Sequence, residues 1–291
     1  MDKPIKDWGT GIPDYTDDDV LDGIELHAFC TNTVAQSMQD DGYTIDGVIV
    51  NHTPTQVIAN RGGRQYYVIV AGGIYPNEGR ISFGMKNKFA DFSLNQGVTP
   101  MFASVGLMSH DAERAAAGLA LKYDGYMIKF TGLEDLSALK TPTPDSKDYR
   151  AYCVERIIDA YKTGRFDGIY DLFAENIQYH SQWILNQLVG KKELIAYFDG
   201  KGENLRNSSS KVNGSVVVIR RDNKRSGNRV KLSDMFKLSE PEKVCALISQ
   251  TINGNTNWVF ISPKFDQNNK LSDLSLNDPS LFDFVPYYAF E

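Results

Sequence analysis

The amino-acid sequence predicts two domains, an α/β domain followed by an α+β domain, and three observations lead to this prediction. The chain has 291 residues, of which 42% are hydrophobic, and this is enough for two cores of ordinary domain size. The stretch KTPTPDSK at 140–147 places two prolines among small polar residues, which is typical of an exposed linker. The residues before this stretch and those after it show different orders of predicted helices and strands. We therefore expect domains at 1–139 and 149–291, joined by a linker at 140–148.

The first domain is predicted to follow the order α-β-β-β-α-β-α-β. Its first helix is expected over 18–40, opened by the three carboxylates at 17–19. The residues expected on the buried face of this helix are Leu21, Ile24, Leu26 and Phe29. Gly62 and Gly63 supply the positive φ of a tight hairpin turn. The remaining predicted elements are strands at 43–50, 56–60, 65–71, 99–105 and 125–130, and helices at 80–95 and 111–121.

The second domain is predicted to place helices first and a curved antiparallel sheet after them. A short strand at 177–181 and a hook at 183–189 interrupt the helices. The helices are expected at 149–161, 166–172 and 191–197, and the long strands at 211–221, 229–237, 243–251 and 258–265. Helices segregated to one face of such a sheet define an α+β fold.

One hairpin of the first domain carries a resemblance to a known family. The stretch PTQVIANRGGRQYYVIVAGG, a helix and the strand TPMFASVGL resemble the PD-(D/E)xK restriction-endonuclease-like superfamily over residues 18–131. In that family, an acidic residue on one strand and an acid-x-Lys motif on the next hold a divalent metal that activates water. Alternate side chains of a strand share a face, which explains the spacing. The three family positions fall here on Gln56, Ile69 and Ala71, which cannot bind a metal in the family's way, so the resemblance implies a pseudo-nuclease.

A shift of the alignment does not restore the nuclease site, because no Asp or Glu lies between Gly47 and Asn77. The alternative is a metal-dependent nuclease with relocated ligands. The side chains that could then converge on a metal are Glu25, Asp46, Glu78 and Lys86, although carboxylates at such positions are also common on ordinary surfaces. Residues 1–140 carry a net charge of −7 and the rest of the chain +1, so the first domain lacks the overall basic footprint of nucleic-acid binding. A nucleic-acid partner is therefore not expected.

The stretch AYKTGRFDGIYDLFAENIQYHSQWILNQLVGKKELIAYFDGKGENL resembles the nuclear-transport-factor-2-like superfamily over residues 149–291. This superfamily, with a cystatin-like fold, includes ketosteroid-isomerase-like and SnoaL-like polyketide-cyclase enzymes. The resemblance implies a pocket at the wide end of a bent sheet, for a small apolar or aromatic ligand, and a homodimer paired through the sheet. The candidate pocket wall consists of Tyr179, Trp183, Phe198 and Trp258, and ordinary core aromatics are the alternative. Alternation puts Tyr179 and His180 on opposite faces of their strand, and either face could point inward.

His180 and Asp199 are the candidate catalytic residues of the second domain, as general acid or base, although no dyad spacing links them. We therefore favour a non-catalytic binding protein without a cofactor. The alternatives are a small-molecule isomerase or dehydratase using these two residues, and the relocated nuclease.

Two further features bear on compartment. No apolar run reaches the roughly 18 to 20 residues of a membrane span, and no apolar stretch follows the charges at the start of the chain, so we expect a cytoplasmic protein without a membrane partner. Cys30, Cys153 and Cys245 are widely spaced and are expected to be free structural thiols.

Overall fold

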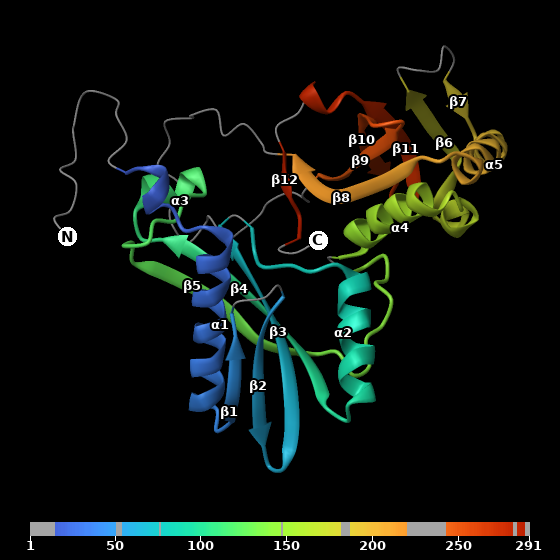
Figure 1. Ribbon diagram of the computed structural model, residues 1–291. Coiled ribbons are helices and arrows are strands. Elements are labelled where there is room, and N and C mark those ends of the chain that lie inside the picture. Colours follow the sequence, from blue (N-terminus) through green and yellow to red (C-terminus); the bar gives the residue numbers. More distant parts are fainter. Residues whose placement is uncertain are drawn as a thin grey trace, which may run out of the picture. The chain divides into compact units, whose positions relative to one another are not determined.

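The computed structural model describes residues 15–50, 54–75, 77–146, 148–181, 187–219, 243–281 and 284–288 (Figure 1). These residues fall into two compact units, of which the first ends at Leu139 and the second begins at Lys140. The strand expected at 229–237 lies outside the described residues. No helix in the described ranges is long and apolar enough to cross a membrane.

The first unit contains a five-stranded mixed sheet with the strand order β1-β2-β3-β4-β5. Its elements are η1 (Asp17–Asp19), α1 (Gly23–Asp40), β1 (Thr44–Ile49), β2 (Thr55–Arg61), β3 (Arg64–Ile74), α2 (Phe83–Asn95), β4 (Thr99–Ser109), α3 (Ala112–Ala117) and β5 (Tyr126–Asp135). Strands β3 and β4 are parallel, and the other neighbouring pairs are antiparallel. The predicted order of helices and strands is confirmed.

Helix α1 differs from its prediction in its start and in its buried face. The helix begins at Gly23 because Asp22 caps it, accepting a hydrogen bond from the Glu25 backbone N at 2.7 Å. Its buried residues follow a spacing of four: Leu26, Cys30, Val34 and Met38. Ile24 and Phe29 are 66% and 37% exposed, so their expected burial was wrong. The stripe that begins at Leu26 continues for three turns along one face, whereas Ile24 and Phe29 lie off it.

Helices α1 and α2 cover opposite faces of the first sheet. Val68 and Val70 of β3 join the core that contains the buried residues of α1. Phe102 of β4 pairs with Ile69 and contacts Lys86 of α2. Since alternate residues of a strand point to opposite faces, Ile69 and Phe102 lie on the α2 side.

The second unit is an α+β unit with a seven-stranded sheet of order β12-β8-β9-β10-β11-β6-β7. Its elements are α4 (Tyr149–Thr163), η2 (Asp167–Leu172), β6 (Phe173–Ser181), β7 (Leu188–Val189), α5 (Lys191–Asn207), β8 (Lys211–Ile219), β9 (Val244–Ile252), β10 (Asn255–Phe265), β11 (Leu271–Asn277), η3 (Pro279–Leu281) and β12 (Phe284–Pro286). The sheet is mixed rather than antiparallel as expected, because β11 inserts between β10 and β6 and runs parallel to β6.

The two faces of this sheet differ in what covers them. Helices α4 and α5 pack on one face, where Ile177, Tyr179 and Leu274 join their side chains in the main core. We call this the helix face. On the other face, called here the outer face, Cys245 and Phe260 pack with Phe284 of β12. The three cysteines are buried and free, which confirms their prediction as structural thiols.

Candidate functional site

The three residues singled out by the comparison with nucleases lie together on the α2 side of the first sheet. Gln56 of β2 is the direct cross-strand partner of Ile69 in β3, and Ala71 follows two residues later on the same face. Ile69 and Ala71 are fully buried. The three residues therefore share one face, where they present an amide and two hydrocarbon side chains.

The chain that connects β3 to α2 lies directly on this face. A Cβ atom on Gly79 would be 1.9 Å from the carbonyl oxygen of Ala71, and one on Gly73 would be 2.6 Å from the carbonyl carbon of Glu78. Ser104 Oγ holds this connection by donating a hydrogen bond to the Gly79 carbonyl at 2.7 Å. The connection therefore approaches β3 too closely for a side chain on either Gly73 or Gly79.

The residues considered for a relocated metal site do not converge. Three of them belong to separate ion pairs, namely Glu25 with Lys122, Glu78 with Lys129, and Lys86 with Glu134. Asp46 is exposed in β1. Within the residues that the structure describes, no group of three or more His, Cys, Asp or Glu side chains could hold a metal ion.

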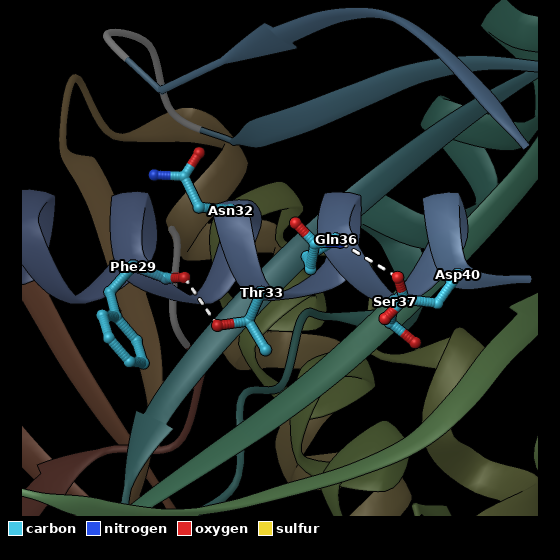
Figure 2. Close-up of a pocket in the computed structure, with 6 residues that line it drawn as sticks. All are labelled: Phe29, Asn32, Thr33, Gln36, Ser37 and Asp40. Atoms are coloured by element: carbon cyan, nitrogen blue, oxygen red, sulfur yellow. Dashed lines mark hydrogen bonds between the residues drawn. The ribbon is translucent and has the colours of Figure 1, made fainter.

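A surface groove of about 510 Å³ runs along the exposed face of α1 (Figure 2). Its described lining residues all come from this one helix: Phe29, Asn32, Thr33, Gln36, Ser37 and Asp40. Figure 2 shows that two of its polar side chains bond within the helix, because Thr33 Oγ1 donates to the Phe29 carbonyl and Gln36 Nε2 to Asp40 Oδ1. With Asp40 as its one ionisable lining residue among those described, the groove brings no groups together for catalysis.

The two candidate catalytic residues of the second unit do not form a dyad. His180 sits in β6 beside Ser275 of β11 on the outer face, and its Nε2 is 3.6 Å from Asp273. Asp273 is buried and also accepts hydrogen bonds from Lys264 and Ser275. Asp199 lies on α5 and accepts a hydrogen bond from the Tyr170 hydroxyl at 2.6 Å. His180 and Asp199 therefore belong to different polar networks.

The candidate pocket residues divide between the two faces of the sheet. Tyr179 and Phe198 are buried on the helix face and touch edge to face, with ring centroids 5.5 Å apart. Trp258 is 52% exposed. It pairs with Ser249 and alternates with Val259, which packs on the helix face, so Trp258 belongs to the outer face. Trp183 lies outside the described residues.

Two further tyrosines and a lysine lie near Tyr179, and we call the four residues the tyrosine–lysine cluster: Tyr161, Tyr179, Tyr197 and Lys201. Tyr161 comes from the last turns of α4 and Tyr179 from β6. Tyr197 and Lys201 lie four residues apart on α5, so they share one face of the helix. The rings of Tyr179 and Tyr197 are 5.2 Å apart.

The hydroxyl of Tyr179 is the exceptional atom of this cluster. It is fully buried and has no hydrogen-bond partner of ordinary geometry among the described residues. The hydroxyls of Tyr161 and Tyr197 are nevertheless close enough that, together with burial, they raise the pKa of Tyr179. An unsatisfied buried hydroxyl costs about 1 to 3 kcal/mol, and native structures contain few of them.

Lys201 brings a positive charge to the same place. Its Nζ donates to Tyr161 Oη at 3.3 Å and lies 4.7 Å and 5.7 Å from the ring centres of Tyr161 and Tyr197. Aromatic faces attract a cation, but burial still lowers the pKa of Lys201. A partly buried ammonium and an unsatisfied hydroxyl thus lie together. Groups in such an environment can bind a ligand or transfer a proton.

Sequence reasoning did not find this cluster as a unit. Tyr179 was identified from strand alternation, but Tyr161, Tyr197 and Lys201 were not. The one local signal for them is the spacing of Tyr197 and Lys201, which places an aromatic ring and a cation on one helix face. Tyr161 joins them only through tertiary packing.

Comparison with known sequences identifies one family. The profile of a domain of unknown function, DUF8840, matches residues 24–136, the segment from α1 to β5. No curated protein matches this sequence.

Comparison with solved structures finds proteins of low identity. An NTF2-like protein of unknown function from Cytophaga hutchinsonii aligns with 45% of this chain and 97% of its own, at 10% identity and a TM-score of 0.30. A protein with a cystatin-like fold from Nostoc punctiforme aligns with 47% of this chain and 78% of its own, at 18% identity and a TM-score of 0.31. A putative polyketide cyclase from Sinorhizobium meliloti aligns with 43% of this chain and 93% of its own, at 12% identity and a TM-score of 0.29. At these scores, the function of the chain has to be argued from its own residues.

Proposed function

We propose that the protein is a non-catalytic binding protein, in which the second unit holds a small molecule at the tyrosine–lysine cluster. Support comes above all from the buried hydroxyl of Tyr179, which has no hydrogen-bond partner among the described residues. A phenylalanine at this position would fill nearly the same volume without the cost of an unsatisfied hydroxyl. A hydroxyl kept at such a cost beside a partly buried lysine is best explained by a ligand that bonds to it.

The surroundings of the cluster suit a small apolar or aromatic ligand. Phe166 and Phe198 stack with centroids 4.6 Å apart, and Phe198 also contacts Tyr161, Tyr179 and Tyr197. Small-molecule sites are typically built in this way, from apolar and aromatic walls with a few polar groups. As part of the same proposal, this unit is a member of the nuclear-transport-factor-2-like superfamily, which it resembles in sequence.

In the same proposal, the first unit is an inactive relative of the restriction-endonuclease-like superfamily. Its order of helices and strands agrees with that family's core, and Gln56, Ile69 and Ala71 share one face. The connection through Gly79 crosses that face. This unit would then contribute a folded domain or a binding surface, without metal chemistry.

The test is to replace Tyr179 with phenylalanine in the full chain and to measure both stability and ligand binding. We expect Tyr179→Phe to be more stable than the wild type by about 1 kcal/mol, because the unsatisfied hydroxyl is gone. Small molecules that raise the melting temperature of the wild type should lose their effect on this variant. Thermal denaturation with a library of aromatic and cyclic compounds measures both quantities.

Tyr170→Phe is the matched control, because the Tyr170 hydroxyl bonds to Asp199 outside the cluster. It should leave every ligand-induced shift unchanged. If Tyr179→Phe is clearly destabilised, or if compounds shift both proteins equally, the hydroxyl is an ordinary core group and the proposal is wrong.

A small-molecule isomerase or dehydratase is the second candidate, and one observation favours it. Tyr161 and Lys201 form a hydrogen-bonded pair, and burial lowers the pKa of the lysine. A lysine tuned in this direction can act as a general base nearer to neutral pH. Lys201→Arg separates the two functions, since an arginine keeps the charge but does not release its proton. Binding retained with turnover lost would establish the enzyme, whereas binding without turnover in the wild type would exclude it for the compounds tested.

A further inference from the structure

The tyrosine–lysine cluster has more hydrogen-bond donors than acceptors. A lysine ammonium offers three donors and no acceptor, whereas each phenol offers one donor and one acceptor oxygen. The polar partners of Lys201 are the hydroxyls of Tyr161 and Tyr197. The Tyr179 hydroxyl adds another donor, and within the described residues it makes no hydrogen bond of ordinary geometry, although the hydroxyls of Tyr161 and Tyr197 are close.

Three carboxylates on the neighbouring elements have partners outside the cluster. Asp199 on α5 accepts from Tyr170, Glu155 on α4 accepts from Tyr288, and Asp273 on β11 pairs with Lys264 on the outer face. None of the groups that perturb the pKa of Lys201 in the described chain is a carboxylate. The partly buried cation therefore has aromatic and hydroxyl neighbours where a buried lysine would ordinarily have an anion.

We infer that the ligand of this cluster carries an anionic oxygen, and specifically that it is a carboxylate attached to an apolar or aromatic body. This inference rests on the proposed function of the site as a small-molecule site. The carboxylate adds charged acceptors for Lys201 and Tyr179 to the neutral phenol oxygens, and charge-assisted hydrogen bonds of this kind are the strong ones. The rings of Phe166 and Phe198 stack on each other nearby and contact the apolar body.

The cluster also explains why a neutral analogue of such a ligand would bind less well. An amide of the same shape offers one acceptor oxygen and adds two N–H donors. In a site already rich in donors, these groups would have no acceptor beyond the phenol oxygens. The ratio of the affinities for a carboxylate and its amide therefore measures the contribution of the negative charge of the ligand, separately from that of its shape.

The experiment compares matched probes on the full chain, namely benzoate with benzamide and 2-naphthoate with 2-naphthamide. Calorimetry or ligand-observed NMR gives the affinities. We expect each carboxylate to bind on the order of tenfold more tightly than its amide. This ratio should fall to about one in Lys201→Met, which keeps the length of the stem but removes the charge.

Lys192→Met is the control on the same helix, because Lys192 is exposed, and it should leave the ratio unchanged. Tyr179→Phe provides a second measurement in case Lys201→Met does not fold, and it should also reduce the ratio. Amides that bind as tightly as the carboxylates, but lose affinity in Tyr179→Phe, would contradict the inference of an anionic ligand. The proposed binding function of the cluster would remain. If neither class binds, both proposals fail.

Discussion

At the scale of single residues, strand alternation predicted which side chains share a face but not which face is buried. It put Gln56, Ile69 and Ala71 together, and the cross-strand register agrees. In β6 it left two orientations open, and the structure places Tyr179 inward and His180 on the outer face. Packing against α4 and α5 decides this, and no local pattern in the strand contains that information.

His27, which is buried in α1, makes the stability of the first unit depend on pH. Its Nδ1 accepts a hydrogen bond from the Gly72 backbone N at 3.1 Å, and burial lowers its pKa. As the pH falls below about 6.5, the unfolded chain takes up a proton that the folded chain resists. We therefore expect the free energy of unfolding to decrease below about pH 6.5, by up to about 1.4 kcal/mol per pH unit.

Urea denaturation of wild type and His27→Asn between pH 7.5 and 5.5 checks this expectation. The asparagine oxygen can accept from Gly72 but does not titrate, so the part of the slope due to His27 should disappear. His27→Ala should be less stable at every pH, because it leaves the Gly72 N–H without this acceptor. An unchanged slope in His27→Asn would show that other groups cause the acid sensitivity.

At the scale of elements, periodicity predicted those helices and strands whose signal is local. Periodicity failed where a residue makes a contact with a segment that is distant in the sequence. Helix α5 was expected to end at 197, before the sequence GKG, but it continues to Asn207. Gly202 lies in this continuation, and a Cβ there would be 2.5 Å from the Gly164 carbonyl. Gly202 therefore permits the close approach of α5 to the end of α4.

The connection from β3 to α2 supports a prediction at this scale. Gly79→Ala places a methyl group 1.9 Å from the Ala71 carbonyl oxygen, and backbone on both sides leaves little freedom to relax. We expect a loss on the order of 3 kcal/mol in the free energy of unfolding. Gly84→Ala is the control, because nothing lies within 4 Å of its Cβ position in α2, and it should stabilise by about 0.5 to 1 kcal/mol. Chemical denaturation that gave both variants similar stability would contradict the close contact.

At the scale of the whole molecule, the order of helices and strands in the first unit was predictable from the sequence, but the mixed sheet of the second unit was not. Strand β11, with the sequence LSDLSLN, was not predicted, and it has only seven residues. Its parallel neighbour β6 is far away in the sequence, and such pairings have no local signature. The tyrosine–lysine cluster was incomplete for the same reason, since α4, β6 and α5 each contribute to it.

The homodimer that the resemblance of the second unit implies stays a proposal, and the outer face makes it testable. Phe284 packs on one part of this face, and Trp258 is exposed on another. If the face pairs two copies of the chain, Trp258→Lys should shift the mass measured by light scattering from dimer to monomer, because a buried unpaired charge opposes association. Tyr123→Lys, at an exposed aromatic of the first unit, should have no effect. A wild type that is monomeric at high concentration would contradict the proposal.

The parallel pairing of β11 with β6 also constrains how the second unit can be made. Strand β6 ends at Ser181 and β11 begins at Leu271, so about 90 residues separate the two partners. Until β11 has left the ribosome, β6 and β7 have no strand to join them to β10, and a contact of such long sequence separation forms slowly. The sheet of this unit is therefore complete only after β11 has been synthesised, and a chain truncated before β11 would expose an open sheet edge that favours aggregation or degradation.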